Sequence, residues 1–169
     1  MVRKGTMAVM CVINERMGMA YVFKKHKMID GKKYGPTDNG WYYQPADYHG
    51  KVNKPKCKKG RKAKEEEHEY KTHWILTKSQ QYDAFLEGER GDYMDSNNMI
   101  SVLDNCNVVM GEDGERIALF PVPPKGTVDW HGYPIASKEE KLTSELMDKL
   151  FKGNAINFTI YSRMQRRDL

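Results

Sequence analysis

Four side chains of the kinds that bind zinc lie in the first half of the chain, at spacings that zinc sites do not use. They follow one another as H-x7-C-x10-H-x4-H, at His49, Cys57, His68 and His73. Structural zinc sites bring their ligands in close pairs such as C-x2-C. Two residues five positions apart share neither a helix face nor a strand face. We therefore expect no metal and no other cofactor, and these four residues are the candidate ligands if a metal binds.

The stretch Asp129-Trp-His-Gly-Tyr-Pro134 concentrates side chains that carry chemistry in one short loop. A carboxylate close to a histidine can orient the imidazole as a general acid or base, and loops that carry such residues are frequent active sites. One alternative is therefore a small hydrolase or nuclease centred on His131 and Asp129. The sequence identifies no nucleophile for this pair, so we favour a structural loop anchored by its aromatic side chains.

Positive charge is concentrated in residues 51–64, here called the basic segment, which contain eight Lys or Arg and no Asp or Glu. Glu65–Glu67 follow it, and the rest of the chain is close to neutral although the whole carries a net charge of +5. Lysines release counterions when they contact phosphates, and aromatic rings beside them suit the bases of single strands. The candidate nucleic-acid-binding residues are Lys54, Lys56, Lys58, Lys59, Arg61, Lys62, Lys64, Trp41 and Tyr43.

The function we expect from the sequence is a small non-enzymatic interaction protein that binds nucleic acid or a nucleoprotein through the basic segment. Charge runs also occur simply as solvated loops, and the same lysines suit an acidic protein partner. Besides the hydrolase, a second alternative is a protein-binding module, such as an inhibitor or a phage accessory protein. An enzyme predicts a concave pocket at His131, whereas a protein-binding module predicts an exposed apolar patch.

The length of 169 residues suits a single domain with one core. No apolar run approaches the roughly 20 residues that span a bilayer, and the start of the chain lacks the long apolar region of a signal peptide. Three widely spaced cysteines do not suit a disulfide framework. These features predict a cytoplasmic protein that makes no membrane contact.

Hydrophobic periodicity predicts an α+β fold with a small, mostly antiparallel sheet. The apolar runs at 7–13, 19–23 and 40–43 predict an N-terminal meander, with a type I′ turn at Asp30-Gly31. The stretch at about 44–67 is polar and lacks periodicity, so we expect a long, exposed and mobile loop there.

The second half of the chain predicts further strands and the main helices. A strand at 70–76 precedes a helix that begins with a capping box at Thr77–Gln80 and ends near Gly88. A short helix at 99–103 and a hairpin of 106–110 with 116–120 follow. A capping box at 137–140 then predicts an amphipathic helix with an apolar stripe, at Leu142, Leu146, Met147, Leu150 and Phe151.

Two C-terminal helices complete the expected fold. Gly153 is placed to end the first of them as a left-handed cap. The second begins near Asn157, with Phe158, Tyr161 and Met164 facing inward and with three arginines facing outward, at Arg163, Arg166 and Arg167.

Overall fold

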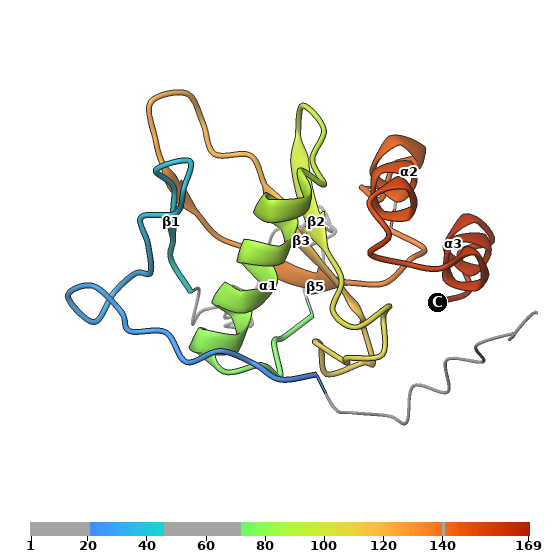
Figure 1. The fold of residues 1–169 in the computed structure, drawn as a ribbon, viewed down its shortest axis with the longest axis horizontal. Helices are drawn as coiled ribbons and strands as arrows, with labels where there is room; N and C mark the ends of the chain where they lie inside the picture. Colours follow the sequence, from blue (N-terminus) through green and yellow to red (C-terminus); the bar gives the residue numbers. More distant parts are fainter. Residues whose placement is uncertain (1–20, 46–71, 140) are drawn as a thin grey trace, which may run out of the picture.

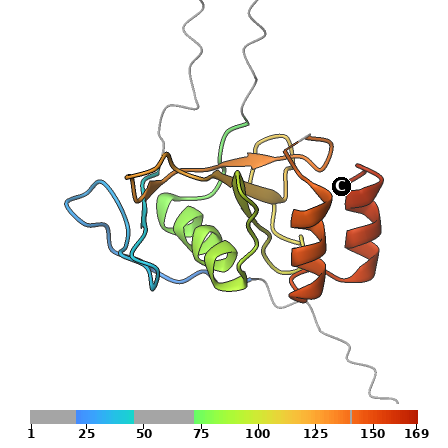
Figure 2. The same cartoon turned by 90° about the horizontal axis from the view of Figure 1, so that it is seen from above.

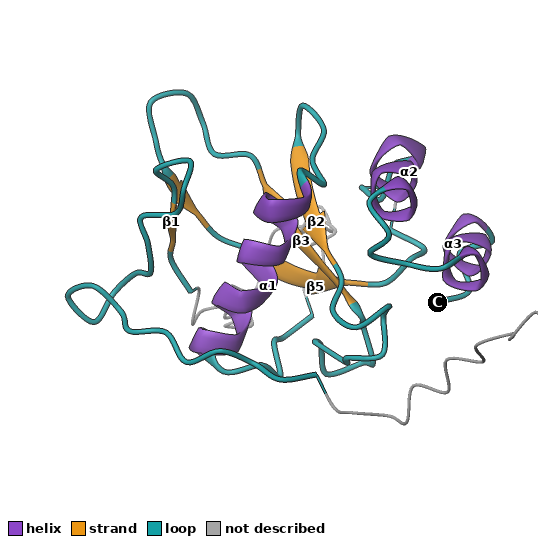
Figure 3. Cartoon of the chain, in the orientation of Figure 1, coloured by secondary structure: helices purple, strands orange, loops and turns teal. Residues whose placement is uncertain are grey.

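The computed structural model describes residues 21–45, 72–139 and 141–169, and Figures 1 and 3 show a mixed α+β arrangement of these residues. The helices are α1 (Lys78–Gly91), α2 (Ser144–Lys152) and α3 (Phe158–Gln165). The strands are β1 (Tyr42–Tyr43), β2 (Asn98–Ser101), β3 (Ile117–Pro121), β4 (Asp129–Trp130) and β5 (Tyr133–Ile135). The predicted fold class and the C-terminal helix pair are confirmed.

Strand β3 is the centre of an antiparallel sheet with the order β2-β3-β5, while β1 and β4 form a separate parallel pair. Ile117 and Leu119 of β3 pack into a core layer with α2 and α3, whereas Ala118 and Phe120 pack into a layer with α1. This alternation is the one that a pleated strand imposes. Figure 2 shows α1 on one side of the sheet and the α2–α3 pair on the other. The sheet is therefore the middle of three layers.

Helix α1 begins with the predicted capping box. The Thr77 side chain accepts a hydrogen bond from the Gln80 amide, and the Gln80 side chain accepts one from the Thr77 amide. The helix runs past its predicted end at Gly88 because Asp92, with φ 52°, makes the left-handed cap. A Cβ on Gly88 would stand 2.9 Å from the Ile100 carbonyl oxygen, so the glycine lets α1 pack close to β2.

Helix α2 begins after its cap Thr143 and not at the predicted capping box at 137–140. Ser137 has a different role, since its hydroxyl donates to the Leu169 carbonyl and accepts from the Leu169 amide. The predicted left-handed cap at Gly153 is also wrong, because Gly153 has φ −79° and Asn154 takes the left-handed conformation with φ 58°. Ser137, which has the sequence pattern of a helix cap, thus bonds to Leu169 instead.

Helix α3 begins near Asn157, as predicted, and the Asn157 side chain caps it by accepting a hydrogen bond from the Ile160 amide. The inward side chain is Met164, which is fully buried, whereas Phe158 is 69% exposed and Phe151 of α2 is 37% exposed. The predicted inward position of Phe158 is therefore wrong. The arginines predicted to face outward are all exposed, at Arg163, Arg166 and Arg167.

The segment predicted as a helix at 99–103 is strand β2. The Asp95 carboxylate accepts from the amides of Asn97 and Asn98, so these polar residues form a turn and not a helix cap. Pairing with β3 then holds the segment extended. The strand is followed by three residues with left-handed backbone, with φ of 48°, 52° and 63° at Asp104, Asn105 and Cys106.

Two other predicted strands are largely absent from the described residues. Strand β3 exists, but its partners are β2 and β5 and not 106–110, because the left-handed turn occupies the start of that range and Arg116 donates to the Cys106 and Asn107 carbonyls. The described part of 70–76 contributes one isolated bridge, between Trp74 and Gly111.

The described part of the predicted meander differs from the prediction. Asp30 and Gly31 have φ of 52° and 65°, as a type I′ turn requires, and a bridge between Ile29 and Lys33 closes the turn. Residues 21–23, however, belong to no strand, and β1 pairs in parallel with β4. The run at 7–13 and residues 46–67 of the predicted loop lie outside the described residues.

Candidate nucleic-acid interface

The two chain segments that flank residues 46–71 are anchored to the same strip of the protein. The Gln44 amide donates to the Trp130 carbonyl at 2.8 Å, and the Trp74 indole Nε1 donates to the Gly132 carbonyl at 2.9 Å. His131 lies in sequence between the two acceptors. Figure 2 shows both segments reaching the side of the molecule formed by β4 and β5. The sequence containing the basic segment therefore leaves and rejoins the described fold beside the loop Asp129–Pro134.

A partly exposed platform, defined as Lys33, Trp41 and Tyr42, lies next to this strip. The Trp41 ring packs on Trp130 with 4.8 Å between the ring centroids. The Lys33 ammonium lies 4.1 Å from the centroid of the Tyr42 ring, a distance suited to a cation–π contact. Trp41 and Tyr42 both keep part of their surface exposed. The platform thus offers aromatic rings and a cation at the place where the chain enters residues 46–71.

Tyr43, which the sequence placed in the binding surface, is part of the core and is fully buried. Its ring stacks on Phe85 at 5.3 Å, and its hydroxyl donates to the Gln81 side chain at 3.0 Å. Burial raises the pKa of this phenol above its usual value of 10.0. Tyr42 keeps part of its surface exposed, so it is the tyrosine of β1 that can reach a ligand, and the assignment of Tyr43 is corrected.

The candidate acid–base pair lies in the same region, but its carboxylate has another partner. Asp129 is exposed and accepts a hydrogen bond from the Lys33 ammonium at 3.1 Å, and His131 is half-buried. Two cavities, of about 370 and 380 Å³, border α1, and neither is lined by Asp129 or His131. Through Lys33, the Asp129 carboxylate is linked to the platform.

Several predicted site residues lie outside the described part of the chain, and of the four candidate metal ligands only His73 lies within it. Among the described residues, no group of three His, Cys, Asp or Glu side chains could hold a metal ion, and no helix is long and apolar enough to cross a membrane. The predicted residues without a described position are His49, Cys57, His68, Lys54, Lys56, Lys58, Lys59, Arg61, Lys62 and Lys64.

A histidine–carboxylate pair that the sequence did not indicate joins His26 to Asp83 of α1. His26 Nε2 is 2.5 Å from Asp83 Oδ1, and the Lys24 amide donates to Oδ2 of the same carboxylate at 2.5 Å. The His26 ring also packs edge-on against Tyr82, at 4.9 Å between centroids. Asp83 is 4% exposed, and its contacts with Lys24 and His26 hold the segment before the Asp30-Gly31 turn against the helix. No local pattern reveals such a pair, because its members are 57 residues apart.

Comparisons of the chain with protein families, with curated proteins and with solved structures find no match.

Proposed function

We propose that this protein binds single-stranded nucleic acid through the basic segment, assisted by the platform of Lys33, Trp41 and Tyr42. The observation that supports the proposal is the placement of eight Lys or Arg without an acidic residue in a segment whose flanks are anchored at Trp130 and Gly132. Both anchors lie beside the platform, because Trp130 packs on Trp41. A nucleic acid strand bound to the segment then has aromatic rings within its reach.

Electrostatics and stacking have different parts in this binding. Lys33 is paired with Asp129, so the platform adds little net charge and the attraction for phosphates comes from the basic segment. The rings of Trp41 and Tyr42 supply the preference for single strands, because stacking on an aromatic side chain stabilises each base by about 1–3 kcal/mol. Lysines that bind phosphates do not read base edges, so the proposal includes weak sequence preference.

The test is a fluorescence-anisotropy titration of a labelled oligothymidine at several salt concentrations. For single strands the log–log slope against salt is about −0.7 per neutralised phosphate, so the wild-type slope should amount to several units. A variant with five cations replaced by Ser should lose most of its affinity and show a flatter slope, with the changes at Lys56, Lys58, Lys59, Arg61 and Lys62.

A matched variant controls for total charge. It removes five lysines that are exposed in the described structure and lie outside the basic segment, namely Lys25, Lys27, Lys32, Lys125 and Lys138. It should keep a slope close to that of the wild type. Equal losses in the two variants, or no wild-type binding at low salt, would reject the proposal and leave the segment as a solvated loop or a docking segment for an acidic protein.

The same samples separate binding from hydrolysis. After the titration, the oligonucleotide is run on a denaturing gel and should be intact. Cleavage by the wild type that disappears in His131→Ala would replace the binding proposal with the enzyme alternative. A Tyr42→Ala variant should weaken binding to single strands more than binding to duplex, because duplex bases are not available for stacking.

A further inference from the structure

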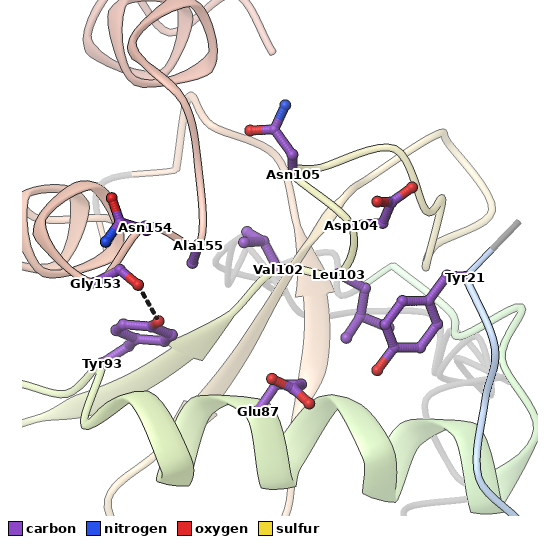
Figure 4. A pocket seen from close by; sticks show the side chains of 10 residues that line it. All are labelled: Tyr21, Glu87, Tyr93, Val102, Leu103, Asp104, Asn105, Gly153, Asn154 and Ala155. Atoms are coloured by element: carbon purple, nitrogen blue, oxygen red, sulfur yellow. Dashed lines mark hydrogen bonds between the residues drawn. The ribbon is translucent and has the colours of Figure 1, made fainter. Parts of the chain in front are cut away.

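A cavity of about 370 Å³ lies where α1, the residues after β2 and the turn between α2 and α3 meet. Figure 4 shows Tyr21 and Tyr93 on either side of Val102 and Leu103, with the Glu87 carboxylate directed toward the space from α1. The volume lies within the range of roughly 300–1,000 Å³ that is usual for small-molecule sites. The cavity is separate from the platform, which contributes no residue to it.

Tyr93 forms one wall of the cavity, and two glycines packed against its ring hold it in place. A Cβ on Gly91 would come within 2.1 Å of the Tyr93 ring, and a Cβ on Gly153 would come within 2.6 Å of it. The ring therefore lies in a slot between two glycines that admits no larger side chain. Its hydroxyl also donates to the Gly153 carbonyl at 3.4 Å. A wall fixed in this way loses little conformational entropy when a ligand binds.

The charged residues that line the cavity are both acidic, namely Glu87 and Asp104. Arg90 forms an ion pair with Glu87, but its side chain is 58% exposed and lines the neighbouring cavity of 380 Å³. The negative charge of Glu87 also acts on the phenols of Tyr21 and Tyr93. Burial and then Glu87 raise the pKa of Tyr21 to about 12, and the same two causes raise the pKa of Tyr93 above 10.0.

This combination of groups selects a class of ligand. A cation gains from the faces of tyrosine rings and from charge-assisted hydrogen bonds to carboxylates, whereas an anion would be repelled. A bare metal ion is not favoured, because no cluster of three ligating side chains exists among the described residues. An organic cation uses both the rings and the acids.

We propose that this cavity binds a small organic cation, a primary ammonium or a guanidinium, between Tyr21 and Tyr93, with Glu87 and Asp104 supplying the countercharge. The proposal does not depend on nucleic-acid binding, since it uses different residues.

The experiment is an NMR titration of the full ¹⁵N-labelled chain with benzylamine, and with benzyl alcohol as a neutral molecule of the same shape. Benzylamine should shift the amide signals of Tyr93, of 102–105 and of 153–155, and it should bind about tenfold more tightly than the alcohol, as expected for a hydrogen bond to a charged group. Phenylguanidine serves as the guanidinium probe and should shift the same signals.

Three variants locate the site. Glu87→Gln keeps the shape of the side chain and should weaken benzylamine binding about tenfold, while Glu112→Gln, an exposed residue outside the cavity, should leave it unchanged. Asp104→Asn should also weaken binding, and it suits the fold because Asn tolerates the left-handed backbone at this position. Equal affinity for amine and alcohol, shifts spread over the surface, or folded Glu87→Gln and Asp104→Asn variants that bind like the wild type would overturn the proposal.

Discussion

The core layer between the sheet and α1 is mainly aromatic, whereas the layer between the sheet and the C-terminal helix pair is mainly aliphatic. In the first layer, Phe85 contacts four other rings, with centroid distances of 5.3 to 6.2 Å. In the second, the fully buried side chains from the helix pair are Leu146, Leu150 and Met164. The two faces of one sheet are thus filled by different kinds of side chain.

The layers also differ in the parts of the chain that build them. The aromatic layer combines residues that are far apart in sequence, such as Tyr34, Phe85 and Trp130, whereas most of the aliphatic layer comes from residues 93–164. The aromatic layer also positions β1 and β4, and therefore the anchors on either side of residues 46–71. This difference predicts that damage to the aromatic layer affects the proposed nucleic-acid interface, while damage to the aliphatic layer lowers stability and leaves that interface unchanged.

The largest effect is expected from Phe85→Ala, because this ring is fully buried at the centre of the aromatic layer. The substitution should lower the free energy of unfolding by about 4 kcal/mol, as truncation of a buried Phe usually does. Urea titration followed by far-UV circular dichroism measures the loss, and near-UV spectra should show weaker aromatic signals. A loss below about 1 kcal/mol would mean that the layer does not have the close packing described.

A smaller loss, of about 3 kcal/mol, is expected from Leu150→Ala in the aliphatic layer. Leu150 is fully buried, and its removal leaves a cavity between α2 and the sheet. The near-UV spectrum should be almost unchanged in the folded variant, and binding to oligothymidine should equal that of the wild type at a temperature where both are folded. A parallel loss of nucleic-acid binding would contradict the division of roles between the two layers.

The parts of the fold that the sequence predicted correctly depend on short-range contacts. The capping box at Thr77 joins a side chain to an amide three residues later, and the helix predicted to start near Asn157 is capped in the same way. The turn at Asp30-Gly31 needs only its own backbone conformation. Ser137 shows the opposite case, since it has the pattern of a cap but bonds to Leu169. Local patterns cannot tell which of two such partners a hydroxyl will find.

The same limit applies to the candidate sites. Trp41 and Tyr43 are close in sequence, but burial of Tyr43 depends on contacts with Gln81 and Phe85, which periodicity does not report. The cavity beside α1 takes Glu87 from the helix, Asp104 from a left-handed turn and Gly153 from the end of α2. These residues share no spacing rule, so only the folded chain brings them together.

The smallest expected effect concerns alkaline pH. Burial raises the pKa of Tyr34, Tyr43 and Tyr82 above 10.0, so the unfolded chain loses these protons first. Their protonated state therefore contributes stability that is present below about pH 10 and is lost as the pH rises above it. For each phenol that stays protonated only in the folded state, the free energy of unfolding falls by about 1.4 kcal/mol per pH unit above that value.

Tyr43→Phe isolates this contribution. The variant leaves the Gln81 side-chain oxygen without the hydroxyl that donates to it, so it should be about 1 kcal/mol less stable than the wild type at neutral pH. Above about pH 10 the wild type should lose stability more steeply than the variant, and the difference between them should shrink. Cys106→Ala is the comparison from the aliphatic layer, because burial raises the pKa of the Cys106 thiol from 9.0 to about 12. The pH profile of Cys106→Ala should depart from that of the wild type about one pH unit below the pH at which the Tyr43→Phe profile departs from it. Urea titrations at a series of alkaline pH values measure all three proteins, and parallel profiles for the wild type and Tyr43→Phe would show that the Tyr43 phenol is not shielded from water.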